Sequence, residues 1–439
     1  MSKLKESFVQ YYQNLLGSEE SEAFFAALEA KKTRRSIRVN TLKLSKSELK
    51  KWLKSQGYTV TDNPFSPDGI DLEGKGKLLA LKLPYHAGFT YPQDSSSMFG
   101  VELLDPKPNE WVIDLTAAPG GKSSHIAAKM KNSGVLVSND WDRNRIKALR
   151  YNFERLGVQN GIIMSMLPHK LSALFSETFD RVLLDPSCSG EGLWVTPKAK
   201  PDFWNPKALK RYASEQFGLL KSAFTLLKPG GRLVYSTCTL NPIENDGVVD
   251  RLMKEFPQAE LVALPEHLKE NIPEQIKPFK GVRFWPHKSG TKGFFCIALT
   301  KKESIFPGDI LQKESFEPDF SSHPLFPDKL FIKLGDLYYL VPKDFKEFPF
   351  PETFFLSLPF IKKDNSGDRL THAAALFPGI QSEKIYVLDR EQVEALFSQK
   401  IVPRKDLEEG EGLALYEKFP LGWVKVKADK VEFNLPKQF

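Results

Sequence analysis

Cysteine is scarce in this chain of 439 residues, with three copies and no Cys-x-x-Cys pair. That count excludes a disulfide framework and gives no sign of a zinc site, because both need clustered cysteines, so we expect no metal. Free thiols suit a reducing compartment, and we expect a cytoplasmic protein. No apolar run approaches the length that spans a membrane, and the first residues lack the apolar core of a signal peptide.

Two glycine-rich signatures of nucleotide binding are also missing. The dinucleotide pattern G-x-G-x-x-G does not occur. A phosphate loop is matched only at its end by Gly121-Lys122-Ser123, because position 116 is threonine where that loop has glycine. No internal repeat or low-complexity tract is present. Hydrophobic residues (41%) and charged residues (27%) occur as in a soluble globular protein, and the length suits two or three domains.

Positive charge is concentrated near the N-terminus. The net charge is only +7, but ten Lys or Arg and a single acid lie between Lys31 and Lys54. A dense basic segment attracts polyanions such as nucleic acid. From charge alone, a solvated basic face without a function is an equally good interpretation of this segment.

Hydrophobic periodicity divides the chain into three regions. Helical spacing over 1–30 and a small α+β pattern over 35–85, with a strand at 37–42 and a helix at 47–53, predict an N-terminal region covering 1–90. Alternating strands and helices predict an α/β domain over 91–302 with a parallel sheet. We expect its strands at 111–115, 134–139, 161–166, 179–185, 232–237 and 293–299, its helices at 121–131, 142–156 and 207–227, and a turn at 229–231. Short apolar strands broken by turns predict a strand-rich C-terminal domain over 303–439.

A candidate cofactor loop follows the first strand of the α/β region. Small residues and two glycines would let a ligand approach the backbone, and the helix start would offer free N–H groups to a carboxylate. The methionine end of S-adenosylmethionine fits this loop, and Asp140 stands where a carboxylate would meet its ribose hydroxyls. A glycine turn followed by a helix-capping aspartate remains the alternative. The loop comprises Thr116, Ala117, Ala118, Pro119, Gly120, Gly121 and Lys122.

Two of the three cysteines follow predicted strands. Cys188 comes shortly after the strand that ends at Asp185, and Cys238 follows the next parallel strand. Because ligands bind at the carboxyl ends of such strands, we expect all three side chains to face one pocket. A thiolate that adds to carbon 6 of cytosine makes carbon 5 nucleophilic toward a sulfonium methyl, and a carboxyl group beside the exocyclic amine would stabilise that adduct.

The alternative for each cysteine alone is a small buried hydrophobe, and this is our interpretation of Cys296. No histidine base is evident, because His169 is expected at the surface.

The chain resembles the Sun/Nop family of RNA cytosine-5 methyltransferases and is most similar to their RsmF type, which acts on small-subunit ribosomal RNA. The resemblance covers nearly the whole chain and includes a C-terminal PUA-like module. The matching segments are 34–43, 93–98, 117–122, 185–192, 229–240, 244–245 and 420–425.

The resemblance implies roles for particular residues. Cys238 would be the nucleophile, and Cys188 would assist product release. Thr116 to Lys122, Asp140 and Asp185 would contact S-adenosylmethionine, with Asp185 also near the target base. The residues it assigns to RNA binding are Arg34, Arg35, Arg38 and Asn40.

Three positions depart from the family pattern. Thr116 replaces a cysteine in the cofactor loop. Pro186 lies one place earlier than the proline that usually precedes the cysteine, which bears on the pose of Cys188. Leu167 replaces the aspartate expected after the third strand, which puts the contact to the adenine amine in doubt.

The sequence therefore predicts a monomeric, S-adenosylmethionine-dependent methyltransferase of ribosomal RNA, acting on free RNA or the assembled small subunit. The target base must leave its stack to reach a thiol. A tRNA cytosine-5 methyltransferase is one alternative. A DNA methyltransferase would use Cys188 as its nucleophile, and a non-catalytic ribosome-assembly factor would need neither cysteine.

Overall fold

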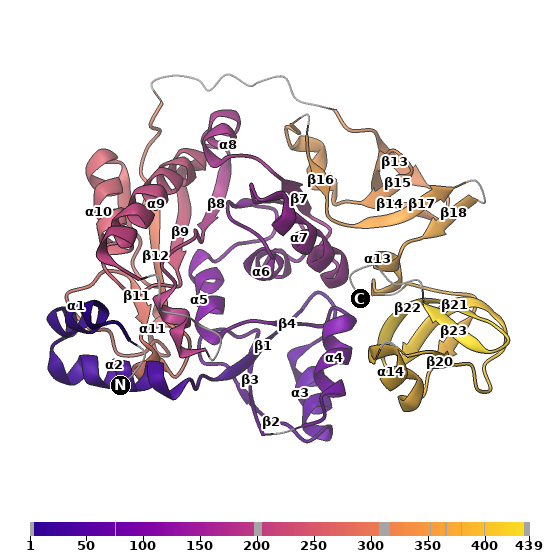
Figure 1. Cartoon of the computed structure of the whole chain (residues 1–439). Coiled ribbons are helices and arrows are strands. Elements are labelled where there is room, and N and C mark those ends of the chain that lie inside the picture. Colours follow the sequence, from indigo (N-terminus) through magenta and orange to yellow (C-terminus); the bar gives the residue numbers. More distant parts are fainter. Residues whose placement is uncertain are drawn as a thin grey trace.

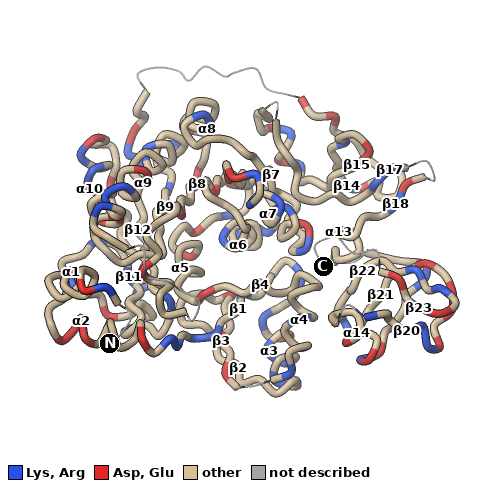
Figure 2. The backbone as a smooth tube through the Cα atoms, viewed as in Figure 1, with Lys and Arg blue, Asp and Glu red and all other residues tan. Residues whose placement is uncertain are grey.

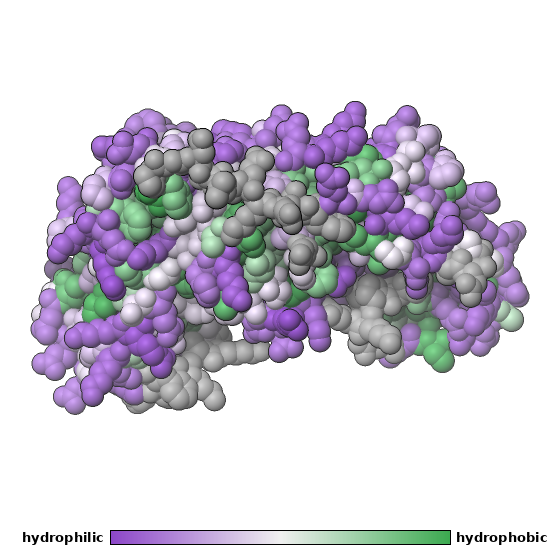
Figure 3. Space-filling model, turned by 90° about the horizontal axis from the view of Figure 1, so that it is seen from above, coloured by the Kyte–Doolittle hydropathy of each residue, from purple (hydrophilic) through white to green (hydrophobic). Residues whose placement is uncertain are grey.

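The computed structural model shows a central sheet flanked by an N-terminal unit and two C-terminal sheets (Figure 1). The residues that it describes are 4–74, 76–196, 204–306, 317–351, 353–364, 367–378, 380–398 and 400–433. No helix among them is long and apolar enough to cross a membrane. On the face drawn in Figure 3, hydrophilic side chains dominate and hydrophobic ones form scattered patches.

A nine-stranded sheet forms the centre of the molecule, in the order β10-β12-β9-β8-β5-β6-β7-β16, with β11 also paired to β12. The run from β9 to β7 is parallel, whereas β10, β11, β12 and β16 join antiparallel. The bounds are β5 (Trp111–Asp114), β6 (Val135–Asn139), β7 (Gly161–Met164), β8 (Phe179–Leu184), β9 (Leu227–Thr237), β10 (Ala259–Leu261), β11 (Val282–Phe284), β12 (Phe294–Lys301) and β16 (Phe355–Leu356).

Both faces of the parallel strands are buried, which explains their near-continuous apolar sequences. One hydrophobic cluster joins α8, α9 and α10 to one face, and a second joins α5, α6 and α7 to the other. The bounds are α5 (Ser95–Leu104), α6 (Gly121–Lys129), α7 (Arg143–Leu156), α8 (Pro168–Leu174), α9 (Pro206–Leu226) and α10 (Asp246–Glu255). This arrangement confirms the Rossmann-like α/β core.

One predicted turn lies inside a strand. The segment 229–231 belongs to β9, which starts at Leu227 rather than at 232. The pairing of β8 with β9 is irregular between Phe179 and Arg181, and Gly230 has a φ of 76°. The glycines therefore mark a kink in the ladder instead of its beginning.

Two N-terminal helices, α1 (Glu6–Leu16) and α2 (Ser18–Ala30), pack against the α/β core. Their apolar faces share a buried aromatic cluster with three tryptophans that come from distant parts of the chain, and the clustered aromatic residues are Phe8, Tyr12, Phe24, Phe25, Trp194, Trp204 and Trp285. Trp194 lies in the 3₁₀ helix η1 (Glu191–Val195), in the loop that follows Cys188. The N-terminal helices thus contact the region of the predicted site.

A small α+β unit follows, with the sheet order β2-β3-β1-β4. The predicted helix is α3, where Ser45 and Glu48 form a capping box that satisfies the free N–H groups of the first turn. The bounds are β1 (Arg35–Val39), α3 (Lys46–Ser55), β2 (Thr59–Asp62), β3 (Gly69–Glu73), α4 (Leu79–His86) and β4 (Thr90–Pro92). Figure 2 shows Lys and Arg next to this sheet and along α3.

The strand-rich C-terminal region is confirmed, but it contains two five-stranded sheets. Their orders are β13-β14-β15-β17-β18 and β19-β21-β22-β23-β20. Strand β16, also from this region, extends the central sheet by pairing with β7. The bounds are β13 (Phe320–His323), β14 (Phe326–Leu334), β15 (Leu337–Leu340), β17 (Pro359–Asp364), β18 (Gly367–Leu370), β19 (Ile385–Val387), β20 (Val402–Pro403), β21 (Gly410–Tyr416), β22 (Phe419–Val426) and β23 (Lys430–Phe433).

Short helices complete the described chain. They are α11 (Glu266–Lys269), α12 (Pro286–Ser289), the 3₁₀ helix η3 (Lys343–Glu347), α13 (His372–Ala375) and α14 (Arg390–Phe397).

Candidate active site

The two strand-end cysteines meet at the carboxyl edge of the central sheet. Strands β8 and β9 are parallel neighbours, so the loops that follow them lie side by side. The Sγ atoms of Cys188 and Cys238 are 3.1 Å apart, and the Gly192 N–H donates to the Cys238 carbonyl at 2.9 Å. Cys238 and Asp185 line a cavity of about 270 Å³, as the sequence predicted. Cys188, which we expected to face the same pocket, is not part of its lining.

The two thiols have different electrostatic surroundings. Hydrogen bonding to Cys238 and then burial raise the pKa of Cys188 well above its ordinary value. Cys188 therefore keeps its proton and can donate it to the sulfur of Cys238. Burial likewise raises the pKa of Cys296, which lies inside β12 as a small apolar side chain, in line with the prediction.

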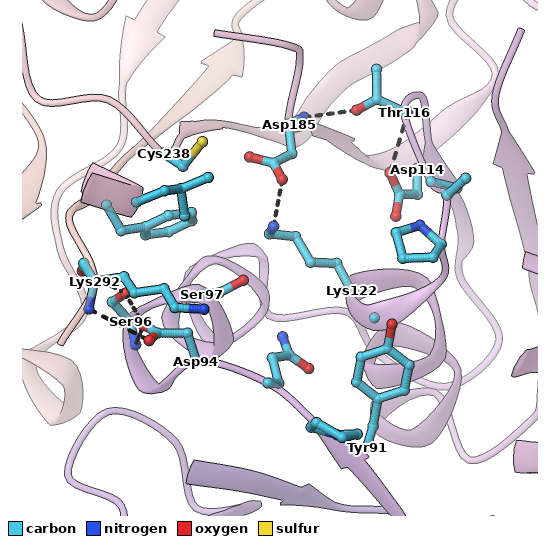
Figure 4. A pocket seen from close by; sticks show the side chains of 18 of the residues that line it. Tyr91, Asp94, Ser96, Ser97, Asp114, Thr116, Lys122, Asp185, Cys238 and Lys292 are labelled. Carbon is cyan, nitrogen blue, oxygen red and sulfur yellow. Dashed lines mark hydrogen bonds and ion pairs between the residues drawn. The ribbon is translucent and has the colours of Figure 1, made fainter. Parts of the chain in front are cut away.

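Asp185 lines the cavity between Cys238 and Thr116, and its carboxylate points toward Lys122 (Figure 4). Its carboxylate accepts from Ser236 Oγ at 2.9 Å and forms an ion pair with Lys122 Nζ at 2.5 Å. Its backbone N–H donates to Thr116 Oγ1 at 3.0 Å, which ties the end of β8 to the cofactor loop. Threonine at position 116 thus supplies a hydrogen bond that a cysteine would make only weakly.

Lys122 places a positive charge beside the reactive groups. Burial alone would lower the pKa of Lys122, but the Asp185 carboxylate outweighs it and the net shift is upward. The ammonium group also lies 5.4 Å from the centre of the Phe294 ring. Lys122 therefore stays charged at the wall of the cavity that Asp185 and Cys238 also line.

The cofactor loop forms another wall of the cavity. The lining includes six of the predicted residues, Thr116, Ala117, Ala118, Pro119, Gly121 and Lys122. Gly120 precedes α6 with a φ of 104°, and a Cβ there would lie 2.9 Å from Leu149. Glycine is therefore required for the tight turn that directs the α6 N–H groups at the cavity.

Two aspartates hold this loop in place. Asp114, at the end of β5, is fully buried and accepts from Ser123 Oγ at 2.6 Å, and burial raises its pKa to about 6. Asp140 accepts from the Ala118 N–H at 3.3 Å and pairs with Arg145 at 3.1 Å. Asp140 lies outside the cavity lining, so its contact with the ribose of a cofactor stays a prediction.

The predicted RNA-binding group divides into exposed and buried members. Arg34 and Arg35 have exposed side chains, and Arg34 lies 3.4 Å from Asp71. For Arg38 and Asn40 the prediction is wrong. Arg38 is buried and donates to the Gly121 carbonyl and to Ser124 Oγ in α6, so its guanidinium has no access to a phosphate.

Asn40 is likewise buried. Its side-chain amide donates to the carbonyls of Gly88 and Leu156, each at 2.7 Å, and so joins the N-terminal unit to α7. Both residues stabilise the packing of the N-terminal unit on the α/β core. Strand periodicity could not reveal this, because polar residues that alternate with Ile37 and Val39 would ordinarily face solvent. Arg38 and Asn40 are buried by their contacts with α6 and with the end of α7.

Several pocket residues escaped the analysis of the sequence. Gln93 lines the cavity, is 8% exposed, and has no hydrogen-bond partner among the described residues for either side-chain amide atom. An unsatisfied amide at a cavity wall is suited to contact a bound ligand. In the sequence, Gln93 belongs to segment 93–98, which matches the family. That match assigned no role to Gln93. Further lining residues are Tyr91, Ser97, Lys292 and Phe294.

A possible metal-ligand cluster lies elsewhere. Within the described part of the chain, Asp68, Glu102 and His125 form the one group with suitable spacing. Lys129 Nζ lies 3.1 Å from Asp68 and 2.9 Å from Glu102, so a side-chain cation already neutralises these carboxylates. The cluster is better described as an ion-pair network between the N-terminal unit and α6.

Comparison with known families explains this site. Residues 101–300 match the model described as 16S rRNA methyltransferase RsmB/F, and residues 4–95 match that of the N-terminal domain of 16S rRNA methyltransferase RsmF. The chain is 30% identical to Ribosomal RNA small subunit methyltransferase F of Shewanella oneidensis, covering 100% of this chain and 97% of the relative. The corresponding protein of Shewanella putrefaciens is also 30% identical, over 100% and 96%.

Solved structures agree with the sequence relatives. A methyltransferase homologue from Pyrococcus horikoshii superposes with a TM-score of 0.58 and 33% identity over 67% of this chain and 94% of that one. NSun6 from the same organism, solved with SFG, gives 0.58 and 26% over 69% and 99%. The chain therefore belongs to the RsmB/RsmF family of S-adenosylmethionine-dependent 16S rRNA cytosine-5 methyltransferases and is RsmF-like over its full length.

Proposed function

We propose that this protein methylates carbon 5 of a cytosine in small-subunit ribosomal RNA through a covalent adduct with Cys238. The observation that carries the proposal is the cavity itself, which Cys238, Asp185 and the cofactor loop line together, with a second thiol 3.1 Å from the first. S-adenosylmethionine supplies an electrophilic methyl group when bound. Everything else in the reaction requires groups that this chain provides.

The proposed reaction starts at Cys238. Its thiolate forms a bond to carbon 6 of cytosine, and the electrons of the 5,6 double bond make carbon 5 nucleophilic. Carbon 5 then accepts the methyl group. A basic group or water in the cavity takes the proton from carbon 5, the electrons of that C–H bond re-form the 5,6 double bond, and the Cys238 sulfur leaves with the electrons of its bond to carbon 6. Lys122, whose pKa is raised, stays charged in the same cavity and is suited to stabilise negative charge that develops during the reaction.

Asp185 is suited to hold the base. One carboxylate oxygen is bound by Lys122 and the other by Ser236, which leaves lone pairs for the exocyclic amine of cytosine. A carboxylate accepts from that amine, whereas the corresponding oxygen of uracil would be repelled. Asp185 therefore contributes to selection of cytosine as well as to orientation.

Cys188 is suited to assist release. Because it is a neutral thiol beside the Cys238 sulfur, it can donate a hydrogen bond or its proton as that sulfur separates from carbon 6. A charged thiolate at Cys188 would instead repel the departing one. The raised pKa of Cys188 thus supports the release role over a role as the attacking nucleophile.

The proposed partner is ribosomal RNA, free or in the small subunit. Since a stacked base cannot reach a thiol in the wall of a cavity, the target cytosine must be unpaired or flipped. Arg34 and Arg35, exposed at the start of β1, are suited to contact the backbone of the RNA. The C-terminal sheet that includes β22 is proposed as a PUA-like RNA-binding module.

Labelled methyl transfer tests this function. Purified small subunits, free ribosomal RNA and tRNA are each incubated with the protein and S-adenosylmethionine, and the products are mapped. We expect 5-methylcytosine in the subunits or in their free RNA. Transfer to tRNA alone would keep the chemistry and overturn the substrate, and no transfer to any of the three would overturn the proposal.

A further inference from the structure

A completely buried carboxylate lies three residues beyond Cys188. Glu191 begins η1 and has no exposed surface. No Lys, Arg or His of the described residues forms an ion pair with it, although a buried charge without compensation is costly. The compensation must therefore come from hydrogen bonds, and their sources show what Glu191 connects.

Six donors surround the two oxygens of Glu191. Oε1 accepts from Trp204 Nε1 at 2.6 Å. Oε2 accepts from Tyr12 Oη at 2.6 Å and from four groups that directly follow Cys238. Those four are Thr239 Oγ1 at 2.6 Å, the Leu240 N–H at 3.2 Å, the Asn241 N–H at 3.1 Å and Asn241 Nδ2 at 3.1 Å. A side chain of the Cys188 loop thus binds the backbone and side chains of the Cys238 loop.

We propose that Glu191 is a positioning residue that sets the distance and orientation between the thiols of Cys188 and Cys238. The catalytic consequence rests on the roles proposed above for these thiols, whereas the geometric claim does not depend on them. The Gly192 N–H bond to the Cys238 carbonyl and the Ser189 Oγ contact with Thr239 Oγ1, at 2.8 Å, join the same two loops on either side of Glu191. The two loops are therefore joined on both sides of Glu191 as well as through it.

The site requires a carboxylate and not merely a polar side chain of that size. Trp204 Nε1 at Oε1 and the Leu240 and Asn241 backbone N–H groups at Oε2 can only donate, so both oxygens must accept. A glutamine would place its NH₂ group against either the Trp204 N–H or the five donors at Oε2. Either placement pairs donor with donor and weakens the link between the loops.

The surroundings keep those donors in place. Burial and then the Glu191 carboxylate raise the pKa of Tyr12 well above its usual value, so its phenol stays protonated and donates. Asn241 is itself held by Glu244, which accepts from Asn241 Nδ2 at 2.8 Å and from the Ser189 N–H at 3.0 Å. Helix α1, η1 and the Cys238 loop are consequently joined at one buried point.

Oxidative cross-linking measures the separation of the thiols without any RNA. Diamide removes two protons and two electrons from a pair of thiols in contact, and a disulfide forms as diamide is reduced to its hydrazine. The rate of the Cys188–Cys238 disulfide is followed in the full-length protein by thiol alkylation and peptide mass spectrometry. We expect Glu191→Gln to slow this reaction by about tenfold or more, because a hydrogen-bond network to a buried charge is lost. The exposed Glu266→Gln serves as a matched control, with wild-type kinetics expected.

A second substitution tests whether donor pairing is the cause. Trp204→Phe removes the one donor at Oε1, so the double variant Glu191→Gln, Trp204→Phe can turn its NH₂ group to that side. We expect this double variant to cross-link at least about threefold faster than Glu191→Gln alone, which a general loss of packing would not produce. If Glu191→Gln fails to fold, Tyr12→Phe replaces it, since it keeps the carboxylate and removes one donor, and slower cross-linking is again expected.

A catalytic readout completes the test. With small subunits as substrate, Glu191→Gln is expected to raise the ratio of covalent protein–RNA adduct to methylated product, because a displaced Cys188 releases the sulfur poorly. Unchanged cross-linking together with an unchanged ratio would overturn the positioning role, even if the variant were less stable. Should Cys238 prove dispensable for transfer, the proposed function would fail, while the cross-linking rates would still decide the role of Glu191.

Discussion

At the scale of single residues, the two thiols are in contact but have different surroundings. Cys188 is held as a neutral thiol by Cys238 and by burial, whereas Cys238 lines the cavity beside Lys122 and Asp185. Under the proposed function, this pair of strand ends supplies a nucleophile and, beside it, a proton donor. Substitution of each cysteine should separate these two functions.

Cys238→Ala is expected to abolish methyl transfer, because no other thiol in the described cavity lining can add to carbon 6. Transfer is measured with labelled S-adenosylmethionine on small subunits. Binding of the cofactor, followed by calorimetry, should persist and serves as the control for folding. Unchanged turnover in this variant would contradict the assignment of the nucleophile.

Cys188→Ala is expected to let a covalent protein–RNA adduct accumulate. Without a neighbouring thiol to donate to the departing sulfur, release slows more than addition does. A denaturing gel of protein and labelled RNA shows the adduct as a shifted band. Normal turnover with no shifted band would rule out the release role.

Gln93→Leu should act on stability and binding in opposite directions. Both amide atoms of Gln93 are buried without partners, so an apolar side chain of similar size should leave the free protein as stable or more stable. The same change removes the groups available to a ligand and should raise KM for the RNA or for the cofactor by about tenfold. Thermal unfolding and kinetics with each substrate varied in turn measure the two effects. If neither KM rises, Gln93 does not contact a ligand.

At the scale of elements, one junction joins three parts of the chain. Lys43, which follows β1, donates to the carbonyls of Arg155 at the end of α7 and Leu376 after α13, each at 2.7 Å. His86, at the end of α4, lies 2.8 Å from the Leu421 carbonyl in β22. Near it is His372 of α13, with ring centres 6.0 Å apart. Buried cations and histidines thus hold the C-terminal elements against the N-terminal unit.

This junction should weaken in mild acid. Burial lowers the pKa of His86 to about 4 and that of His372 to about 3, and the neighbouring Lys43 adds to both shifts. Folding therefore requires neutral imidazoles. Their contribution is complete above the unfolded pKa near 6.5 and is lost as the pH falls toward 4 and then 3, at up to about 1.4 kcal/mol per histidine and pH unit.

The measurement compares the wild type with His372→Gln by thermal unfolding between pH 7.5 and pH 5. Carboxyl groups act in the opposite direction over this range, because burial raises the pKa of Glu154 to about 7 and that of Asp114 to about 6. The expected result is therefore a difference in slope, with wild-type stability falling more steeply toward pH 5 than that of the variant. Equal slopes of stability against pH for the two proteins would show that His372 does not contribute to the pH dependence.

At the scale of the whole molecule, the first and last units share one hydrophobic core. A single cluster contains Leu53 of α3 and Val39 of β1 together with Val424 of β22 and Val393 of α14. Phe419 is fully buried at its centre, 4.9 Å from the ring of Trp52 and 5.4 Å from that of Phe89. Segments more than 300 residues apart therefore stabilise each other by direct packing.

Phe419→Ala is expected to destabilise the protein by about 3–5 kcal/mol, because it opens a cavity between two units that bury each other. Urea unfolding measures the loss, and limited proteolysis should show earlier cleavage near the last sheet. Ile401→Ala, at a side chain that is 76% exposed, is the matched control and should change little. Equal stability of the two variants would show that the units fold independently.

The α/β core could be predicted because its signals are local. Strands such as 111–115 and 134–139 are buried on both faces and are therefore apolar throughout, and the glycine turn at Gly120 marks the start of a helix. Periodicity could not show that the kink at Gly230 lies within a strand, because the Pro-Gly-Gly sequence at 229–231 is equally typical of a turn between two elements. It also could not show that β16 would extend the central sheet across a long sequence separation.

The sequence by itself determined the chemistry: the order of strand ends placed Cys188, Asp185, Cys238 and the cofactor loop at one edge of a parallel sheet. Those positions follow from backbone geometry, which local sequence encodes. Only the tertiary structure decided which polar residues face a ligand and which face the protein. Arg38 became a packing residue, Gln93 a cavity residue and Glu191 the buried link between the thiol loops. Burial and hydrogen-bond partners depend on contacts between distant segments, and no short stretch of sequence specifies them.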